Sequence, residues 1–373
     1  MIFTKNERKI HYMGAILEYK CPCCSGPLQF DTDAQKMKCP YCDNEFDAET
    51  LKSNDDILKE EKPDMMDWSS QPGNEWMQGE LEGQKVYLCN SCGGQIVCDD
   101  TTGATDCPYC GSPVVMVGQF AGDKRPDIII PFKLDKEAAK NGFKQHLCKK
   151  RLLPKAFRTD SYIDDIKGVY VPFWLYDAHA DAQAYFHGTK VKSWSDDKYN
   201  YTKTSHYRLY RNGSMDYERV PVDGSSKIAD DLMESLEPFT ADGEVAFQTA
   251  YLSGYMADKY DVDSNESNGR ANERIKKSTL DRLTSTTTDF TSVTTESSSV
   301  QLDNGTVKYA LYPVWLLTAK WNGDIYNFAM NGQTGKFVGN LPMDKGAYWR
   351  WTGLIALIAT VAALAVSTFV LLN

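Results

Sequence analysis

The sequence lacks the short motifs that mark the common enzyme classes. Its 373 residues contain no GxSxG nucleophile elbow, no GxGxxG dinucleotide loop and no HExxH metalloprotease helix, and the five histidines show no metal-ligand spacing. The stretch Gly332-Gln-Thr-Gly335-Lys336 is close to a phosphate loop, but two residues separate its glycines instead of four. Phe337 also stands where a serine or threonine would bind magnesium, so we interpret this stretch as a hairpin turn. We predict no catalytic site and no small-molecule substrate.

The chain also lacks an excess of positive charge. Its 41 Lys and Arg residues are outnumbered by 51 Asp and Glu residues, and the net charge is −10. Nucleic-acid binding draws much of its affinity from the neutralisation of phosphates, so this balance argues against broad binding of DNA or RNA.

A signal peptide is absent as well, because residues 1–20 hold no apolar core of the needed length. Met13, followed by Gly-Ala-Ile-Leu, is a candidate for the true start, which would leave residues 1–12 as an unstructured addition. We expect residues 1–18 to be an N-terminal extension.

One long apolar run lies at the other end of the chain. Residues 351–372 carry no charge and no proline, and as a helix they reach about 33 Å, against about 30 Å for the hydrocarbon core of a bilayer. Tyr348, Trp349 and Trp351 stand where an interfacial aromatic belt belongs. The alternative, a buried helix of a soluble domain, requires chain on both sides to cover it. We therefore predict a transmembrane helix over residues 348–372 that contacts the lipid bilayer through residues 351–372.

The charges before this run set its orientation. Lys345 and Arg350 lie just upstream, and the positive-inside rule places that flank in the cytoplasm. The expected protein is thus single-pass and tail-anchored in the cell membrane, with its bulk in the cytoplasm. In such a reducing compartment, the 11 cysteines indicate metal binding before disulfides.

Eight cysteines form two copies of one pattern, 68 residues apart. Each copy has a CxxC pair, 14 further residues that suit a β-hairpin, and a second CxxC pair. Four thiolates close a tetrahedral site, which zinc prefers and which leaves no open position for catalysis. We predict two structural Zn²⁺ ions in small β zinc ribbons over residues 19–50 and 85–118. The expected ligands are Cys21, Cys24, Cys39 and Cys42 for one ion and Cys89, Cys92, Cys107 and Cys110 for the other.

A redox function is the alternative for the same cysteines, because Cys39-Pro-Tyr-Cys42 and Cys107-Pro-Tyr-Cys110 each spell a glutaredoxin-like dithiol motif. That chemistry requires the motif at the start of a helix, whereas here a second CxxC closes each copy, which favours zinc. Of the other cysteines, Cys98 is expected as an apolar filler of the hairpin and Cys148 in the core. Cys23 competes with Cys24 as a ligand, but the spacing favours Cys24.

The cysteine pairs resemble zinc ribbons of the transcription factor IIB type, and the whole layout resembles bacterial membrane proteins with zinc ribbons, some labelled putative primosomal helicases. The resemblance implies a zinc site and a setting among membrane-stress proteins of the phage-shock or flotillin type. It leaves the ligand of the ribbons open, because such ribbons bind nucleic acid as well as protein. Three lysines against seven acidic residues give residues 18–50 a charge of −4, and one lysine against three aspartates gives residues 85–118 a charge of −2. These charges disfavour phosphate binding.

Between the two ribbons, residues 51–84 are polar and mostly acidic, and we expect a flexible linker. Trp68 and Trp76 are unusual there. They either pack on a neighbouring domain or form a short segment that binds a partner.

Residues 119–345 are expected to form one α+β domain with an internal repeat. A Pro-x-Trp-Leu motif at Pro172 recurs at Pro313, and alternating strands follow both copies. A buried strand is expected at residues 128–132, helices at 136–151, 226–237 and 270–283, an exposed Thr-rich strand at 284–299, and a hairpin turn at Asn322-Gly323. The likeness of the two motifs predicts two related β-rich halves.

The expected fold class is thus multidomain: two zinc ribbons, one α+β domain and one transmembrane helix. The expected function is that of a non-enzymatic adaptor on the cytoplasmic face of the membrane, whose zinc ribbons bind protein partners. The alternative is a membrane-tethered nucleic-acid-binding protein related to transcription or replication.

Overall fold

The computed structural model describes residues 21, 28–31, 34–47, 68, 72–99, 102, 104, 106–119, 124–148, 150–154, 157, 165–339 and 342–372. Cys23, Cys24, the expected N-terminal extension and most of the expected linker lie outside these residues. The chain divides into two compact units. One comprises Met1–Met65, His179–Asp216 and Ile275–Asp303, and the other comprises Met66–Ala178, Tyr217–Arg274 and Asn304–Asn373.

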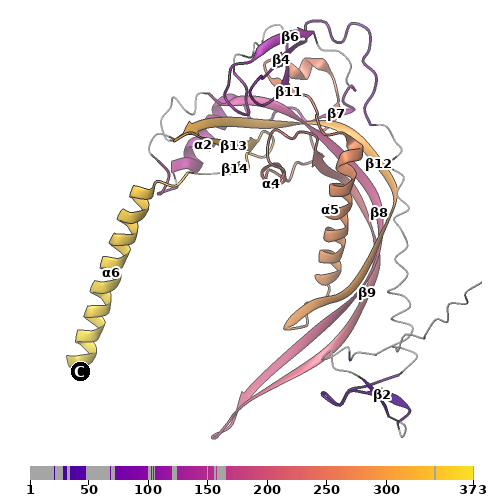
Figure 1. Ribbon diagram of the computed structural model, residues 1–373, viewed down its shortest axis with the longest axis vertical. Coiled ribbons are helices and arrows are strands. Elements are labelled where there is room, and N and C mark those ends of the chain that lie inside the picture. The colour runs from indigo at the N-terminus through magenta and orange to yellow at the C-terminus, as the bar shows by residue number, and fades with distance from the viewer. Residues whose placement is uncertain are drawn as a thin grey trace, which may run out of the picture. The chain divides into compact units, whose positions relative to one another are not determined.

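A large mixed sheet dominates the fold (Figure 1). Its strands follow the order β10-β7-β12-β8-β11-β5-β4-β6, with β9 paired to β8 and β13 to both β12 and β14. Their bounds are Lys85–Leu88 (β4), Gln95–Cys98 (β5), Val115–Gln119 (β6), Ile128–Ile129 (β7), Lys167–Ser195 (β8), Asn200–Asp223 (β9), Val245–Ala246 (β10), Met256–Asp258 (β11), Ser292–Trp321 (β12), Asp324–Asn331 (β13) and Phe337–Gly339 (β14).

The helices of the described chain are α2 (Lys136–Cys148), α4 (Asp230–Ser235), α5 (Ser264–Thr284) and α6 (Lys345–Leu372), with a short 3₁₀ turn at Thr249–Leu252. Aspartates begin α2 and α5 in the same way. Asp135 accepts a hydrogen bond from the backbone N–H of Ala138 through its side chain, and Asp263 does the same for Glu266. Both are N-caps, which satisfy donors that a helix leaves unpaired in its first turn.

The Pro-x-Trp-Leu repeat lies on the two central strands of the sheet. β8 carries the first copy and β12 the second, and the two strands are neighbours. Each also pairs in parallel with one short strand. Val169 of β8 lies opposite Met256 of β11, and Ala310 of β12 lies opposite Ile128 of β7. The halves run β7-α2-β8-β9 and β11-α5-β12-β13, so each half contributes the short strand that pairs with the long strand of the other.

The two tryptophans of the repeat show how closely the halves correspond. The Trp174 indole donates a hydrogen bond of 2.9 Å to the carbonyl of Val262, six residues after Met256, and its ring lies 5.1 Å from that of Tyr260. The Trp315 indole donates one of 3.1 Å to Leu134, six residues after Ile128, and its ring lies 5.0 Å from that of Phe132. The motif therefore fastens each long strand to the loop that enters a helix of the other half.

Most other expected elements are present, with changed bounds. The helix expected at 136–151 ends at Cys148, and the one expected at 270–283 begins earlier, at Ser264. Both expected turns join antiparallel strands: Asn322-Gly323 joins β12 to β13, and residues 332–336 join β13 to β14. Asn322 and Gly323 have φ of 52° and 91°, as a type I′ hairpin requires.

Three expectations about local structure need correction. The expected strand at 128–132 stops at Ile129, since Pro131 has no N–H to donate to a ladder. The helix expected at 226–237 forms only at Asp230–Ser235. The Thr-rich stretch 284–299 begins as the end of α5 and becomes a strand only from Ser292, since helix packing through Leu283 overrides the β propensity of the threonines.

The central strands are buried on both faces, which explains their continuous apolar sequence. Alternate side chains of β8 enter two different clusters. Val169, Val171 and Phe173 lie in a cluster with the second cysteine module (residues 85–118), and Tyr170 and Trp174 lie in one with α5. The sheet thereby positions the second cysteine module, because β5 pairs with β11 through Val97 and Ala257.

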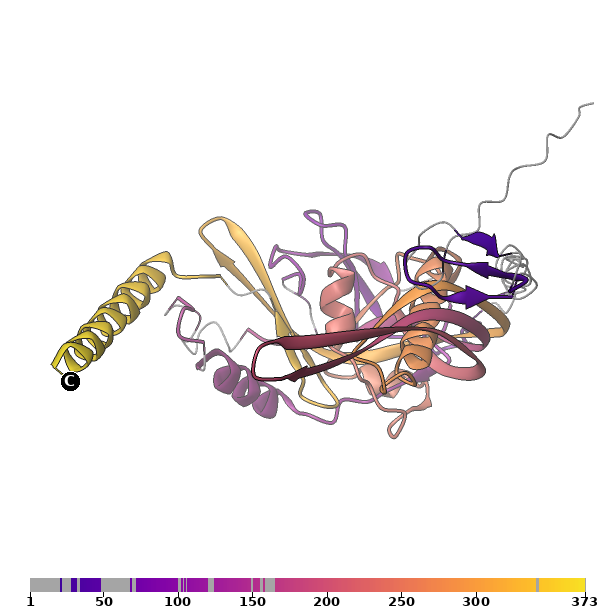
Figure 2. The same cartoon turned by 90° about the horizontal axis from the view of Figure 1, so that it is seen from below.

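The unit that comprises Met1–Met65, His179–Asp216 and Ile275–Asp303 contains the outer parts of β8, β9 and β12 and the C-terminal part of α5, which pack through Ala184, Phe186, Leu209 and Leu283. It also contains the first cysteine module (residues 19–50), whose strands β1 (Gln29–Asp31), β2 (Lys36–Lys38) and β3 (Glu45–Phe46) form a separate sheet. β1 and β2 make the hairpin that the 14-residue spacing predicts. Figure 2 shows this small sheet in indigo.

Candidate metal centres

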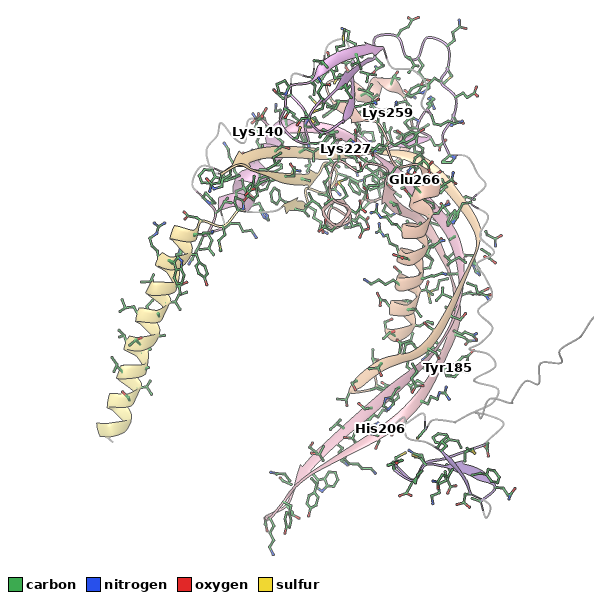
Figure 3. The ribbon with its side chains drawn as sticks, in the orientation of Figure 1. Lys140, Tyr185, His206, Lys227, Lys259 and Glu266 are labelled. Carbon is green, nitrogen blue, oxygen red and sulfur yellow. The ribbon has the colours of Figure 1, made fainter. Side chains whose placement is uncertain are left out.

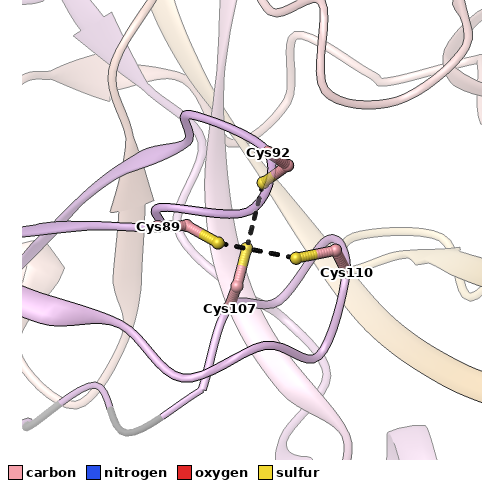
Figure 4. Close-up of side chains that lie close together, drawn as sticks. All are labelled: Cys89, Cys92, Cys107 and Cys110. Carbon is pink, nitrogen blue, oxygen red and sulfur yellow. Dashed lines mark hydrogen bonds between the residues drawn. The ribbon is translucent and has the colours of Figure 1, made fainter.

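The second cysteine module brings its four thiols together. The sulfur atoms of Cys89, Cys92, Cys107 and Cys110 all lie within 4.8 Å of one another (Figure 4). The closest pairs join the two CxxC turns: Cys89 Sγ lies 3.5 Å from Cys110 Sγ, and Cys92 Sγ lies 3.6 Å from Cys107 Sγ. All four residues that the sequence assigns to this site therefore meet at one point.

These distances fit a tetrahedral metal site. Four sulfurs at about 2.3 Å from one zinc ion are about 3.8 Å apart, close to the spacing found here. A disulfide would bring two sulfurs to about 2.05 Å, and none of these pairs is so close. The group could thus hold one metal ion.

The backbone of each CxxC turn explains why its two thiols face the same way. In the turn at Cys89, the Cys89 N–H donates to Gly94 and the Gly93 N–H donates back to Cys89. The turns at Cys107 and Cys39 repeat both bonds, through Ser112 and Gly111 and through Asn44 and Asp43. The residue after the second cysteine has positive φ in all three: 73° at Gly93, 62° at Gly111 and 56° at Asp43. Glycine fits this position because it has no Cβ, and Asp is among the few other residues that adopt it readily.

The first cysteine module has the same arrangement in its described part. Cys21, Cys39 and Cys42 have sulfurs within 4.8 Å of one another, and Cys21 Sγ lies 3.5 Å from Cys42 Sγ. This pair corresponds to Cys89 and Cys110 under the 68-residue shift. Cys24, the fourth expected ligand, lies outside the described residues, so three of the four expected ligands are brought together here.

The thiols of the second module need a cation to ionise together. Burial raises the pKa of Cys92 and of Cys107. Burial also raises the pKa of Cys110, but hydrogen bonds from Ser112 and the neighbouring thiols outweigh it and lower the value to about 6. One thiolate therefore forms readily, whereas four in one place repel one another unless a divalent ion neutralises them.

A buried polar cluster lies beside the second module, and sequence reasoning missed it. Tyr109, inside the Cys107–Cys110 turn, is fully buried and interacts with Asp258 at the end of β11. Burial raises the pKa of Asp258 to about 7, although Ser225, which donates a 2.6 Å hydrogen bond to Oδ2, and Tyr109 both lower it. Asp258 and Ile130 hold equivalent positions in the two halves. An aspartate where the other half has an isoleucine was the sequence signal that could have revealed this cluster.

Lys227 extends this cluster toward the thiols. Its ammonium group is hydrogen-bonded to Asp261, which also accepts a 2.6 Å bond from the Ser226 hydroxyl. The positions of Lys227 and Lys259 are marked in Figure 3. Burial lowers the pKa of Lys227, but the hydrogen bond to Asp261 outweighs it, and the charges of Asp261, Asp258 and Cys92 raise the pKa further. A positive group next to sulfur offsets part of the negative charge of a metal tetrathiolate.

Cys98, Trp68 and Trp76 pack in the unit that contains the large sheet's second cysteine module. Cys98 is fully buried on β5 and is not part of the quartet, as expected for an apolar filler. The Trp68 ring contacts Tyr176 at 4.8 Å, and the Trp76 ring contacts Phe247 at 5.8 Å. Both contacts favour the packing interpretation of these tryptophans. Cys148 is the last residue of α2, and its side chain lies outside the described part of the chain.

The apolar segment forms one helix, α6, whose stretch Lys345–Ser367 is long and apolar enough to cross a membrane. Asp344 caps it by accepting the Ala347 N–H at 2.9 Å. Every described side chain from Tyr348 to Ser367 is exposed, and Trp351 lies under the Arg151 guanidinium at 5.0 Å. The helix thus leaves the domain without a protein surface to cover it in the described chain.

Comparison with known proteins gives one informative match. The chain is 32% identical over 342 residues to YdjG of Bacillus subtilis (strain 168), described as an uncharacterized protein. The match covers 91% of this chain and 94% of that protein. No family model and no solved structure matches the chain.

Proposed function

The chain belongs to the family of YdjG from Bacillus subtilis. From its apolar helix α6 and its two cysteine modules, we propose that it is a membrane-anchored adaptor without enzymatic activity. In this proposal α6 spans the cell membrane once and holds the rest of the chain in the cytoplasm. Each cysteine module holds one structural Zn²⁺ ion. The first module binds a protein partner. The second module has a structural role, because it is part of the large sheet.

The convergence of four cysteine sulfurs carries the zinc assignment. Soft thiolate ligands in a tetrahedral set favour Zn²⁺, and four of them leave no position for a substrate or an activated water. The Cys107–Cys110 turn leads into strand β6 and not into a helix, which favours metal over dithiol redox chemistry.

The two modules differ in what they expose, and this difference supports separate roles. Tyr41 and Tyr109 are equivalent residues of the two CPYC turns, yet Tyr41 is 73% exposed and Tyr109 only 4%. Phe30 of the first module is 50% exposed as well. Exposed aromatic side chains on a rigid turn are typical anchors of protein interfaces.

The partner is proposed to be a protein and not a nucleic acid. Charges of −4 and −2 on the modules repel phosphate, and a zinc tetrathiolate adds negative charge. The resemblance to membrane proteins with zinc ribbons supports partners among membrane-stress proteins of the phage-shock or flotillin type.

A crosslinked pull-down of the full chain from membranes, with and without nuclease, tests this proposal. Partners that survive nuclease and are lost in the variant Phe30→Ala/Tyr41→Ala support a protein adaptor. Met116→Ala is the matched control, because Met116 is equally exposed on the second module, at 57%. Partners that disappear with nuclease would instead indicate a nucleic-acid-binding protein.

A further inference from the structure

The hairpin formed by β8 and β9 ends in a tip that has no buried side chain. Side chains from Val191 to Thr204 are all exposed, on both faces of the two strands. Tyr185 and His206, labelled in Figure 3, lie at the inner end of this segment. A two-stranded hairpin without a packed face gains little stability from itself, so aromatic side chains there need another reason.

Three aromatic rings gather on one face of this tip. The rings of Trp194 and Tyr201 are stacked with centroids 5.5 Å apart, and the Tyr199 ring lies 6.2 Å from that of Tyr201. Their exposed fractions are 47% for Trp194, 39% for Tyr201 and 65% for Tyr199. Asp196 holds the turn in place, because its carboxylate accepts hydrogen bonds from the Tyr199 N–H and the Tyr201 hydroxyl.

The tip is also rich in lysine. Residues 190–203 contain four lysines and two aspartates, a charge of +2 in a chain whose net charge is −10. The contacts of Trp194 with Tyr201 and of Ser193 with Thr202 set a register in which Lys192 lies opposite Lys203. Like charges directly opposite each other on a hairpin are unfavourable, and an anion between them relieves the repulsion.

We propose that this tip, with Lys192, Trp194, Lys198, Tyr199, Tyr201 and Lys203, binds the anionic headgroup layer of a lipid bilayer. Tryptophan and tyrosine prefer the membrane interface because each has an apolar ring and a polar group, and lysine reaches phosphate beyond the rings. The proposal rests on the membrane anchor of the proposed function, because α6 keeps the hairpin at high local concentration near lipid. Salt screens charges beyond about 8 Å, so the local charge of the tip outweighs the distant acidic residues.

The test uses the full chain in lipid nanodiscs of two compositions, phosphatidylcholine alone and phosphatidylcholine with phosphatidylglycerol. The acyl chains carry bromine near the headgroups, which quenches tryptophan fluorescence at short range. The chain has eight tryptophans, so the Trp194 signal is taken as the difference between the wild type and Trp194→Phe. Phenylalanine keeps the ring stacked on Tyr201 and leaves every lysine in place.

We expect the Trp194 emission to shift to shorter wavelength and to be quenched in discs with phosphatidylglycerol, and not in discs of phosphatidylcholine alone. The triple variant Lys192→Gln/Lys198→Gln/Lys203→Gln should lose both effects. The matched control Lys133→Gln/Lys136→Gln/Lys277→Gln removes three exposed lysines elsewhere and should keep them.

Three results would overturn the proposal, and they are distinguishable. A chain that enters the discs with its Trp194 emission unchanged refutes the hairpin contact alone. A chain that fails to enter the discs refutes the membrane anchor, and the hairpin contact with it. Trp194 emission that responds to a single-stranded oligonucleotide but not to phosphatidylglycerol assigns the tip to nucleic acid instead.

Discussion

Replacement of Asp258 by asparagine should stabilise the protein, and the gain should grow as the pH rises. The carboxyl group is 2% exposed, and burial raises its pKa to about 7, whereas an unfolded chain has an ordinary value near 3.8. Because the folded state binds the proton more tightly, folding is favoured in acid. That advantage is lost as the pH rises from about 4 through about 7. Asparagine keeps an oxygen for the Ser225 hydroxyl and has no charge to bury.

The size of the effect follows from the two pKa values. Each pH unit between them corresponds to about 1.4 kcal/mol, so burial of Asp258 costs about 4 kcal/mol at pH 8, where the group is ionised. At pH 5 it costs about 2 kcal/mol, because the folded state then binds a proton that the unfolded chain has mostly released. The difference in unfolding free energy between Asp258→Asn and the wild type should therefore increase by about 2–3 kcal/mol from pH 5 to pH 8. A zinc tetrathiolate nearby carries negative charge and would strengthen this trend.

Urea unfolding of the detergent-solubilised chain, followed by its β-sheet circular dichroism in excess zinc, measures this difference. The cysteines also titrate, but they contribute equally to both proteins, so the comparison cancels them. Asp289→Asn, at an exposed position, is the control and should show a constant difference from the wild type. Parallel curves for Asp258→Asn and the wild type would refute a buried carboxyl group with a raised pKa.

Three further outcomes are expected. The purified chain should hold two zinc ions, measured by atomic emission, and Cys39→Ser or Cys107→Ser should lose one ion each while Cys98→Ala loses none. A stoichiometry of one would contradict two equivalent centres. Binding to random duplex or single-stranded DNA should be undetectable by fluorescence anisotropy at micromolar protein and physiological salt, and a submicromolar, salt-sensitive affinity would contradict the adaptor. Three aspartates inserted near Ala359 should release the protein from phosphatidylcholine vesicles in a flotation assay, because one charge at mid-bilayer costs about 2.5–3.5 kcal/mol. Continued flotation with these uncharged vesicles, which the hairpin tip is not expected to bind, would exclude a spanning α6.

Features that depend on neighbouring residues could be predicted from the sequence. The Asn322-Gly323 turn, the helix at Lys136 and the apolar helix α6 each follow from a local pattern, and the structure contains all three. The cysteine spacing also predicted which of the seven described ligand thiols meet, because a CxxC turn fixes two sulfurs at once.

Features that depend on distant pairing could not be predicted in this way. No local pattern shows that β7 pairs with β12, whose residues lie about 180 positions later. The burial of Asp258 likewise follows from the packing of the second cysteine module on β11, which the sequence near Asp258 does not record. The repeat at Pro172 and Pro313 predicted two related halves but not the exchange of their short strands, because the pairing partners lie outside the motif.

That exchange determines when the protein can fold. β7 is synthesised early and has no parallel partner until β12 has left the ribosome, so neither half can complete its sheet alone. Pairing across so long a stretch of chain is slow, because loop closure costs entropy before the contacts form. By then the chain is only a few tens of residues from α6, since β12 ends at Trp321 and α6 begins at Lys345. Completion of the large sheet and emergence of α6 from the ribosome therefore fall within the same short interval of synthesis.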